Sequence, residues 1–284
     1  MERYINSFAT ENDIQIALDN GELLKPYVAY IEDADRIDWN SKTKTDNKNK
    51  YLTFIITGTG NINVPTGTTY SINGAEWENT GTTITVNSGE TIRFKGNNAT
   101  YESNTFNDST AGFEIEGNIM SLINSTDFAT LTTLESDFTF DGLFDGCTGL
   151  TSAENLILPA TTLAYSCYSG MFQGCTSLTT APELPATTLA NGCYSSMFRG
   201  CTSLTTAPAL PARTLADGCY KSMFWGCRKL NYIKCLATDI SAFSCTNYWV
   251  QSVASTGTFV KNPSMTSWTT GINGIPGGWT VQDA

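Results

Sequence analysis

The sequence contains no histidine, and this absence narrows the chemistry open to the protein. Histidine is the usual general base of Ser-His-Asp and Cys-His nucleophile systems and a common ligand of zinc. Cysteine pairs in the metal-binding pattern Cys-x-x-Cys are missing too. We therefore expect no nucleophile system of these kinds, no bound metal and no cofactor.

Positive charge is scarce along the whole chain. The sequence has 16 lysine and arginine residues against 27 aspartate and glutamate residues, which gives a net charge of −11. The one local concentration of lysines lies between Lys42 and Lys50, in a polar stretch typical of a linker. Binding to a nucleic-acid backbone needs clustered basic side chains. We therefore expect no nucleic-acid partner.

Long apolar runs are absent as well. No stretch approaches the roughly 20 apolar residues that cross a bilayer. Met1–Asn40 lacks the basic start and apolar run of a secretory signal. We expect no membrane insertion, and synthesis in the cytoplasm without a signal peptide. A protein of this kind that acts outside a cell is expected to leave on something assembled inside one.

An internal repeat is the most informative feature that the sequence does contain. Leu158–Glu183 recurs as Leu184–Ala209 with five differences in 26 positions, and more loosely as Leu210–Cys235. A fixed period of this length is typical of a solenoid, in which each turn buries its apolar side against its neighbours. We predict a solenoid over residues 121–235.

Each turn of the predicted solenoid has a simple expected form. A strand and a corner precede a short helix over Cys193–Phe198, and Gly200 supplies a left-handed exit. Residues 236–284 depart from the period and contain bulky aromatic residues suited to closing the last turn. We predict that they form a C-terminal cap.

The nine cysteines fall mainly into two columns with the period of the repeat. Free cysteine behaves as a small buried hydrophobe, so these columns are predicted to lie in the core. An odd count and the missing secretory signal favour reduced thiols over a disulfide framework. The columns are Cys167, Cys193 and Cys219, and Cys175, Cys201 and Cys227.

Residues 46–120 carry short β-rich runs separated by turn residues. Their regular spacing predicts a small antiparallel β-sandwich. Ser88-Gly89, between the third and fourth runs, is the clearest hairpin signal. The expected fold class is therefore mainly β with short helices, as a sandwich followed by a capped solenoid. Strands are predicted at Tyr51–Thr57, Thr69–Ile72, Thr82–Val86, Thr91–Phe94 and Phe113–Glu116.

Residues 1–45 form a leader of different character. Thr10 is a candidate N-cap for a helix that ends at Gly21, and Pro26 opens a strand-like run. The segment is too small to bury a core of its own, so we expect it to dock on another protein. Spaced acids near its end lack the glycine and glutamate of a calcium loop and are expected to be solvated. The predicted docking residues are Ile14, Leu18, Tyr27, Tyr30 and Trp39.

The most regular part of each repeat resembles a known family. The pattern Phe-x-Gly-Cys-x-x-Leu, followed by Leu-Pro after a short strand, begins at Phe172, Phe198 and Phe224. It is similar to the BspA-like leucine-rich repeats, although the repeats here are longer than is usual for that family. Lys25–Asp33 in the leader looks like N-terminal segments of structural proteins from phages and prophages of gut Bacteroidetes. The resemblance implies a leucine-rich-repeat solenoid with an adhesive surface and no catalytic residues.

Comparison of the copies separates packing positions from surface positions. Positions that vary freely are expected to face solvent and to carry any ligand contacts. An exposed Trp225 would stack on a sugar or bind a protein interface, and the alternative is that it covers the start of the cap. The variable columns are Tyr165, Asn191 and Asp217; Gln173, Arg199 and Trp225; and Thr161, Thr187 and Arg213.

These observations favour a non-catalytic virion protein, a head or tail fibre or decoration protein. Its leader would bind other virion proteins, and its outer parts would perform receptor binding on a host-surface glycan or protein. A homotrimer, the usual fibre arrangement, is compatible with this interpretation. The alternative is a BspA-like adhesin on the bacterial cell surface. A glycan-active enzyme is least favoured, although Asp141/Asp145 and Glu114/Glu116 are carboxylate pairs.

Overall fold

The computed structural model describes residues 2–5, 23–26, 47–79, 83–101 and 105–284. The chain divides into two compact units, Met1–Lys42 and Thr43–Ala284. In the first unit, β1 (Glu2–Ile5) pairs in parallel with β2 (Leu23–Pro26). The helix predicted after Thr10 lies outside the described residues and stays a prediction. The same holds for the docking residues Ile14, Leu18, Tyr27, Tyr30 and Trp39.

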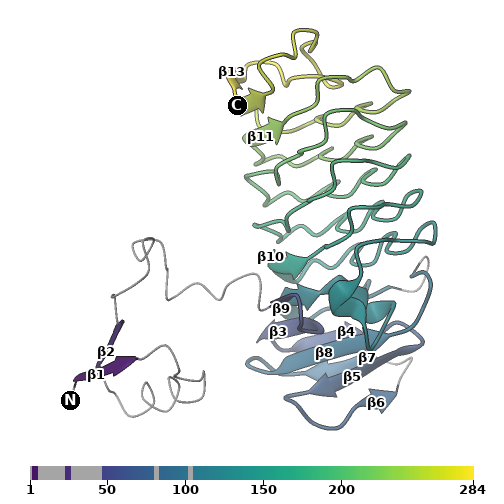
Figure 1. Cartoon of the computed structure of the whole chain (residues 1–284), viewed down its shortest axis with the longest axis vertical. Coiled ribbons are helices and arrows are strands. Elements are labelled where there is room, and N and C mark those ends of the chain that lie inside the picture. The colour runs from purple at the N-terminus through teal and green to yellow at the C-terminus, as the bar shows by residue number, and fades with distance from the viewer. Residues whose placement is uncertain (1, 6–22, 27–46, 80–82, 102–104) are drawn as a thin grey trace. The chain divides into compact units, whose positions relative to one another are not determined.

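The second unit is mainly β and begins with a sheet that is antiparallel except at one edge. Its strands and those of a small neighbouring ribbon are β3 (Leu52–Gly58), β4 (Gly60–Asn63), β5 (Thr68–Ile72), β6 (Glu78–Asn79), β7 (Thr83–Val86), β8 (Thr91–Gly96), β9 (Gly112–Asn118) and β10 (Leu150–Ile157). The main sheet has the order β10-β9-β3-β8-β5-β6, and β10 is parallel to β9 (Figure 1). A separate ribbon pairs β4 with β7. The predicted strands of residues 51–120 are therefore confirmed, whereas β4, β6 and β10 were not predicted.

Aromatic side chains form the core beneath this sheet. Inward and outward residues alternate along β8, so that Ile92 and Phe94 are fully buried. Phe54 on β3 stacks on Phe113 of β9, with ring centroids 4.6 Å apart. It also lies 6.0 Å from Phe144, which belongs to the coils that follow. The sheet and the first coil therefore share one core.

The hairpin predicted around Ser88-Gly89 is wrong, although a turn does occur there. β7 pairs with β4, and β8 pairs with β3 and β5, so the flanking strands belong to different sheets. The turn is bonded instead to β3. The Gly89 N–H donates to the Ile56 carbonyl at 2.8 Å, and the Ile56 N–H donates to the Glu90 carbonyl at 2.9 Å. Gly89, with φ +93°, allows the chain to pass from one sheet to the other.

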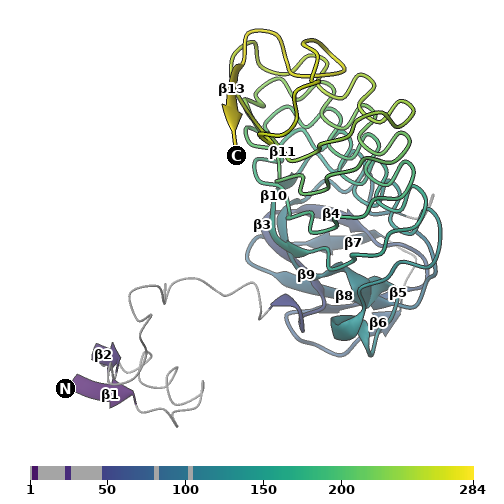
Figure 2. The same cartoon turned by 45° about the horizontal axis from the view of Figure 1, so that its top comes forward.

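After the sheet, the chain winds into a stack of coils (Figures 1 and 2). The first coil rests directly on the sheet, since the Phe113 N–H donates to the Gly149 carbonyl at 3.0 Å. Higher in the stack, the copies of the sequence repeat bond to each other in register. The Tyr194 N–H, for example, donates to the Cys219 carbonyl of the next coil at 3.1 Å. Two short 3₁₀ helices, η2 (Ile119–Leu122) and η3 (Phe128–Thr130), lie between β9 and the coils.

The short helix predicted over Cys193–Phe198 is wrong. The segment is a run of tight turns, because Gly192, Ser196 and Gly200 have left-handed backbones with φ of +66°, +55° and +77°. A right-handed helix does not accommodate a left-handed residue at every fourth position. The spacing recurs in the other coils, at Phe138, Gly142 and Gly146; Ser166, Gly170 and Gly174; Gly218, Ser222 and Gly226; and Ser244, Tyr248 and Ser252.

Stacked aromatic rings fill the interior of the coils. Phe172, Phe198 and Phe224 form one column, with successive ring centroids 5.5 and 5.8 Å apart and nearly parallel planes. Tyr168, Tyr194 and Tyr220 form a second column, with spacings of 5.8 and 6.3 Å. Offset stacking of this kind adds to the stabilisation that burial of the rings provides. The invariant Phe positions of the repeat are therefore packing positions, as predicted, and the Tyr positions pack in the core as well.

The predicted burial of the cysteine columns is confirmed. All nine cysteines are buried, and all are free. The Cys201 thiol donates to the Phe172 carbonyl of the preceding coil at 3.0 Å, and Cys227 makes the equivalent bond to Phe198 at 2.9 Å. Desolvation raises the pKa of the Cys227 thiol to about 12, although backbone hydrogen bonds partly oppose it. The thiols are therefore neutral core groups near pH 7.

The first part of residues 236–284, which were predicted to form a cap, continues the stack as a further coil, because the Tyr220 N–H donates to the Cys245 carbonyl at 2.9 Å and the Phe224 N–H to the Trp249 carbonyl at 2.8 Å. β11 (Tyr232–Cys235), β12 (Thr258–Lys261) and β13 (Thr280–Asp283) form a parallel sheet. Trp249 is fully buried and stacks on Tyr220 at 6.3 Å, and its indole N–H donates to the Gly274 carbonyl at 2.8 Å. In the part of the chain that the structure describes, no helix has the length and apolar character needed to cross a bilayer.

Candidate binding surface on the coils

The residues predicted to face solvent do lie at the surface. Tyr165 is 49% exposed, and Asn191, Arg199, Arg213 and Asp217 are also exposed. Gln173 and Trp225 are half-buried. Comparison of the repeat copies therefore identified surface positions correctly, but the three columns differ in how their side chains interact.

One column holds Asp145, Gln173, Arg199 and Trp225 at the same place in successive coils, and the ring of Tyr248 lies beside Trp225. We call these five residues the ladder. The first four precede the left-handed glycine that ends each run of turns. Backbone hydrogen bonds between successive coils hold these positions side by side. The Gly174 N–H donates to the Arg199 carbonyl and the Gly200 N–H donates to the Trp225 carbonyl, both at 2.7 Å. The repeat thus places unlike side chains at one site in successive coils.

The ladder changes from acidic to aromatic along the stack. The Gln173 amide donates to both carboxylate oxygens of Asp145 at 3.5 Å. The Arg199 guanidinium lies over the Trp225 ring, 4.4 Å from its centroid, which is a cation–π contact. The Trp225 ring in turn lies 6.1 Å from the ring of Tyr248, which is 42% exposed.

Asp145 occupies an unusual position at the start of the ladder. Burial raises the pKa of its carboxyl group, and nearby Asp108 adds to the rise, whereas the hydrogen bonds from Gln173 and from the Gly146 backbone oppose it. The Gln173 amide therefore stabilises a carboxylate that has lost part of its solvation. Because this carboxylate is already paired with an amide, the ladder presents its cation and its rings as the groups open to a ligand.

The column of Tyr165, Asn191 and Asp217 serves partly to bond one coil to the next. The Asp217 carboxylate accepts a hydrogen bond from the Phe243 N–H at 2.8 Å. Asp137, at the equivalent site below Tyr165, accepts from the Tyr165 N–H at 3.1 Å. The interpretation of Asp217 as a free ligand contact is therefore revised, because one of its oxygens is used within the stack.

Arg213 lines a shallow hollow between adjacent coils. The hollow has a volume of about 370 Å³. The backbone carbonyl of Arg213 accepts hydrogen bonds from Thr238 and Asp239 of the next coil at 2.7 and 3.1 Å. Among the described residues, no side-chain contact joins Arg213 to the ladder. The other residues of the hollow are Thr187, Thr188, Leu189, Pro211, Thr214, Leu215 and Ala216.

Two exposed aromatic residues of this surface were not predicted. Tyr248 extends the ladder, and Phe243 is 78% exposed beside Asp217. Both lie in a further coil beyond the last copy of the repeat. Cys245 follows Cys219 at the period of the repeat, and this spacing was the signal in the sequence that could have revealed the coil.

Within the described residues, no group of three or more Cys, Asp or Glu side chains converges on a potential metal site. No protein-family model, no curated protein and no solved structure matches this chain.

Proposed function

We propose that the chain is a non-catalytic structural protein of a virion, displayed at its surface to bind the host cell. In this proposal, residues 46–120 are a small β-sandwich, and the coils are a leucine-rich-repeat solenoid of the BspA-like type. The leader would hold the protein on other virion proteins. The receptor would be a glycan or a protein on the host surface.

The observation that carries the proposal is the ladder on an otherwise constant framework. The core residues Phe172, Phe198 and Phe224 are the same from coil to coil, whereas the ladder position holds Gln173, Arg199 and Trp225 in turn. A stack with a constant aromatic core and unlike side chains along one surface column presents several different contacts at fixed spacing. Such surfaces suit weak binding that gains strength when many copies are displayed together.

The Arg199–Trp225 pair is the part of the ladder best suited to bind a partner. Arginine and tryptophan are enriched among residues that dominate binding energy, because they combine large apolar area with directional polar contacts. Tyr248 extends this aromatic area, with 42% of its surface exposed.

The first test is the location of the protein. Virus particles and cell envelopes from an induced culture of the source bacterium are purified, and peptides of this chain are measured by mass spectrometry. Enrichment in particles is the expected result. Peptides confined to the envelope would refute the virion assignment and favour a cellular adhesin of the BspA-like type.

The second test concerns the ladder. Trp225→Ala is expected to weaken binding of the purified protein to host cells by about tenfold, because removal of a central aromatic contact typically costs 1–2 kcal/mol or more. Thr176→Ala, at an exposed position outside the ladder, is the matched control. Equal binding by both variants would exclude the ladder as the receptor contact.

A further inference from the structure

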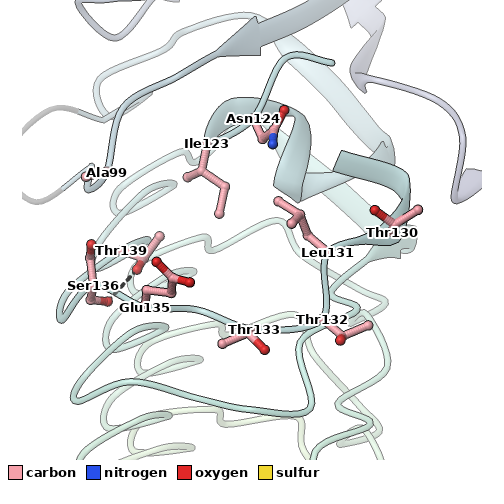
Figure 3. A pocket seen from close by; sticks show the side chains of 10 residues that line it. All are labelled: Ala99, Ile123, Asn124, Thr130, Leu131, Thr132, Thr133, Glu135, Ser136 and Thr139. Atoms are coloured by element: carbon pink, nitrogen blue, oxygen red, sulfur yellow. Dashed lines mark hydrogen bonds between the residues drawn. The ribbon is translucent and has the colours of Figure 1, made fainter. Parts of the chain in front are cut away.

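A second recessed site lies where the coils meet the sheet. It has a volume of about 550 Å³, within the range of pockets that hold small ligands (Figure 3). Its walls come from the loop after β8, from the segments that follow η2 and η3, and from the start of the first coil. The lining residues are Ala99, Ile123, Asn124, Thr130, Leu131, Thr132, Thr133, Glu135, Ser136 and Thr139.

The pocket combines an apolar patch with a wall of hydroxyl groups. Ile123 and Leu131 extend into the hollow from the side of the two 3₁₀ helices (Figure 3), and both pack against the core. Glu135 and Thr133 lie across the hollow from them. A ligand that fits must therefore present both a nonpolar face and several polar groups.

The polar groups of the pocket include both hydrogen-bond donors and hydrogen-bond acceptors that a ligand can use. Among the described residues, the side chains of Thr132, Thr133 and Glu135 have no hydrogen-bond partner. The Thr139 hydroxyl donates to the Ser136 carbonyl at 2.6 Å, and the Thr130 hydroxyl donates to the Asp127 carbonyl at 3.0 Å. Each of these last two oxygens keeps lone pairs that can accept. The wall thus offers both donors and acceptors within a small area.

The charge of the pocket limits the ligand further. Glu135 is the one ionisable residue of the lining, and neither lysine nor arginine contributes to it. Phosphates, sulfates and carboxylates would meet a negative group with no cation to pair with. A saccharide satisfies these requirements when it is neutral, because its hydroxyls both donate and accept and its C–H groups form nonpolar faces.

We infer that this pocket binds a neutral saccharide of one or two rings. Glu135, Thr132 and Thr133 form hydrogen bonds with ring hydroxyls, and Ile123 and Leu131 contact the C–H face of the sugar. The inference goes beyond the proposed function, because the site is separate from the ladder and its binding does not depend on assembly into a particle.

The test uses the full chain and a panel of free sugars: glucose, galactose, mannose, N-acetylglucosamine, maltose and cellobiose. Binding is followed by ligand-observed NMR at millimolar concentrations, where weak sites are detected. At least one of these sugars is expected to bind. Thr133→Val removes one hydroxyl at nearly constant volume, and Ala99→Phe places a bulky ring at the rim of the hollow. Both are expected to weaken binding about tenfold or more, whereas Thr176→Val, an exposed site elsewhere on the coils, leaves it unchanged.

The outcomes separate this site from the ladder. Thermal unfolding of each variant establishes that it is folded before binding is compared. The inference is overturned if none of the sugars binds, or if binding survives both Thr133→Val and Ala99→Phe. Loss of binding in Trp225→Ala alone would assign the sugar to the ladder and also overturn it. Equal affinity for glucuronic acid and glucose would contradict the charge argument.

Discussion

At the scale of single residues, the thiols show how closely the coils are packed. Cys147, Cys175, Cys201 and Cys227 each donate to the carbonyl of a phenylalanine. In the last three, that phenylalanine belongs to the preceding coil. Each of these last three carbonyls also accepts the backbone N–H of the cysteine in its own coil, so the thiol of the next coil is a second donor to it. The thiol therefore serves both as a small apolar group and as a bonding partner between coils.

A charge at one of these positions should unfold the stack. Cys201→Asp places a carboxylate at a site with 0% exposure, and we expect a loss of stability of about 4 kcal/mol or more. Thr176→Asp introduces the same charge at an exposed position, and its free energy of unfolding is expected to stay within about 0.5 kcal/mol of that of the parent. The two variants are compared by denaturant unfolding followed by circular dichroism. A native-like midpoint for Cys201→Asp would show that the column is not core.

The same thiols make stability depend on alkaline pH. Burial raises the pKa of Cys227 to about 12 from the usual 9.0. Between these values the unfolded chain has lost the proton and the folded chain retains it, so stability is fully present below pH 9 and falls as the pH rises toward 12. Each such thiol contributes up to about 1.4 kcal/mol per pH unit. Unfolding free energies measured from pH 7 to 10.5 should fall less steeply in Cys227→Ser, because serine does not titrate there. Parallel slopes would refute this assignment.

Much of the residue-level pattern could be predicted from the sequence. Because the copies share one backbone, their differences marked exposed positions such as Tyr165 and Arg199 without any structure. The partners of those side chains could not be predicted in this way. Whether Asp217 is free or bonded depends on the position of the Phe243 N–H, which lies beyond the copies of the repeat.

At the scale of elements, the coils show that large side chains at helical spacing do not by themselves indicate a helix. Tyr194, Met197 and Phe198 have helical spacing, yet they lie on successive tight turns. The two glycines in each such segment, Gly192 and Gly200 for example, contained the contrary evidence. Two of the five differences between the best copies exchange serine and glycine at left-handed positions, Ser166 for Gly192 and Gly170 for Ser196. The pairing of β7 with β4 could not be predicted either. The sequence of β4, Gly-Asn-Ile-Asn, has a single β-branched residue and no aromatic residue to mark it as a strand.

The left-handed turns should tolerate serine but not a β-branched residue. Gly170 has φ +58°, and a side-chain Cβ there would meet nothing closer than 3.9 Å. The cost of a substitution therefore comes from the backbone alone. Gly170→Ser should cost less than about 1 kcal/mol, as Ser196 and Ser222 already occupy the equivalent sites. Gly170→Val should cost about 2 kcal/mol or more, since branching at Cβ is least compatible with this conformation. Thermal unfolding of the two variants measures the difference, and equal midpoints would contradict the argument.

At the scale of the whole molecule, the second unit is held together across its two kinds of structure. β10 of the first coil pairs with β9 of the sheet, and Phe54 and Phe144 contribute to one core. The residues that follow the first unit in the sequence bond to β9 and β10 of this unit. The Asn47 amide donates to the Asn155 carbonyl at 3.1 Å, and the Asn118 amide donates to the Lys48 carbonyl at 3.0 Å. These bonds place the structural start of the second unit near Asn47.

Removal of the first unit should therefore separate folding from attachment. A chain without residues 2–42 retains Asn47 and Lys48, and its unfolding temperature is expected to match that of the same unit in the full chain within about 2 °C. A chain without residues 2–50 loses both contacts and should unfold at least about 4 °C lower, in line with the loss of roughly 1 kcal/mol or more.

Incorporation into particles tests the other half of this argument. Particles produced with the shorter deletion in place of the native gene should lack the protein, because the predicted docking residues Ile14, Leu18, Tyr27, Tyr30 and Trp39 are all removed. Its purified form should still bind host cells through the ladder, although with lower apparent affinity than many copies on one particle. Particles that retain the shortened protein would exclude the leader as the docking segment. An unfolded product would show instead that the two units depend on each other.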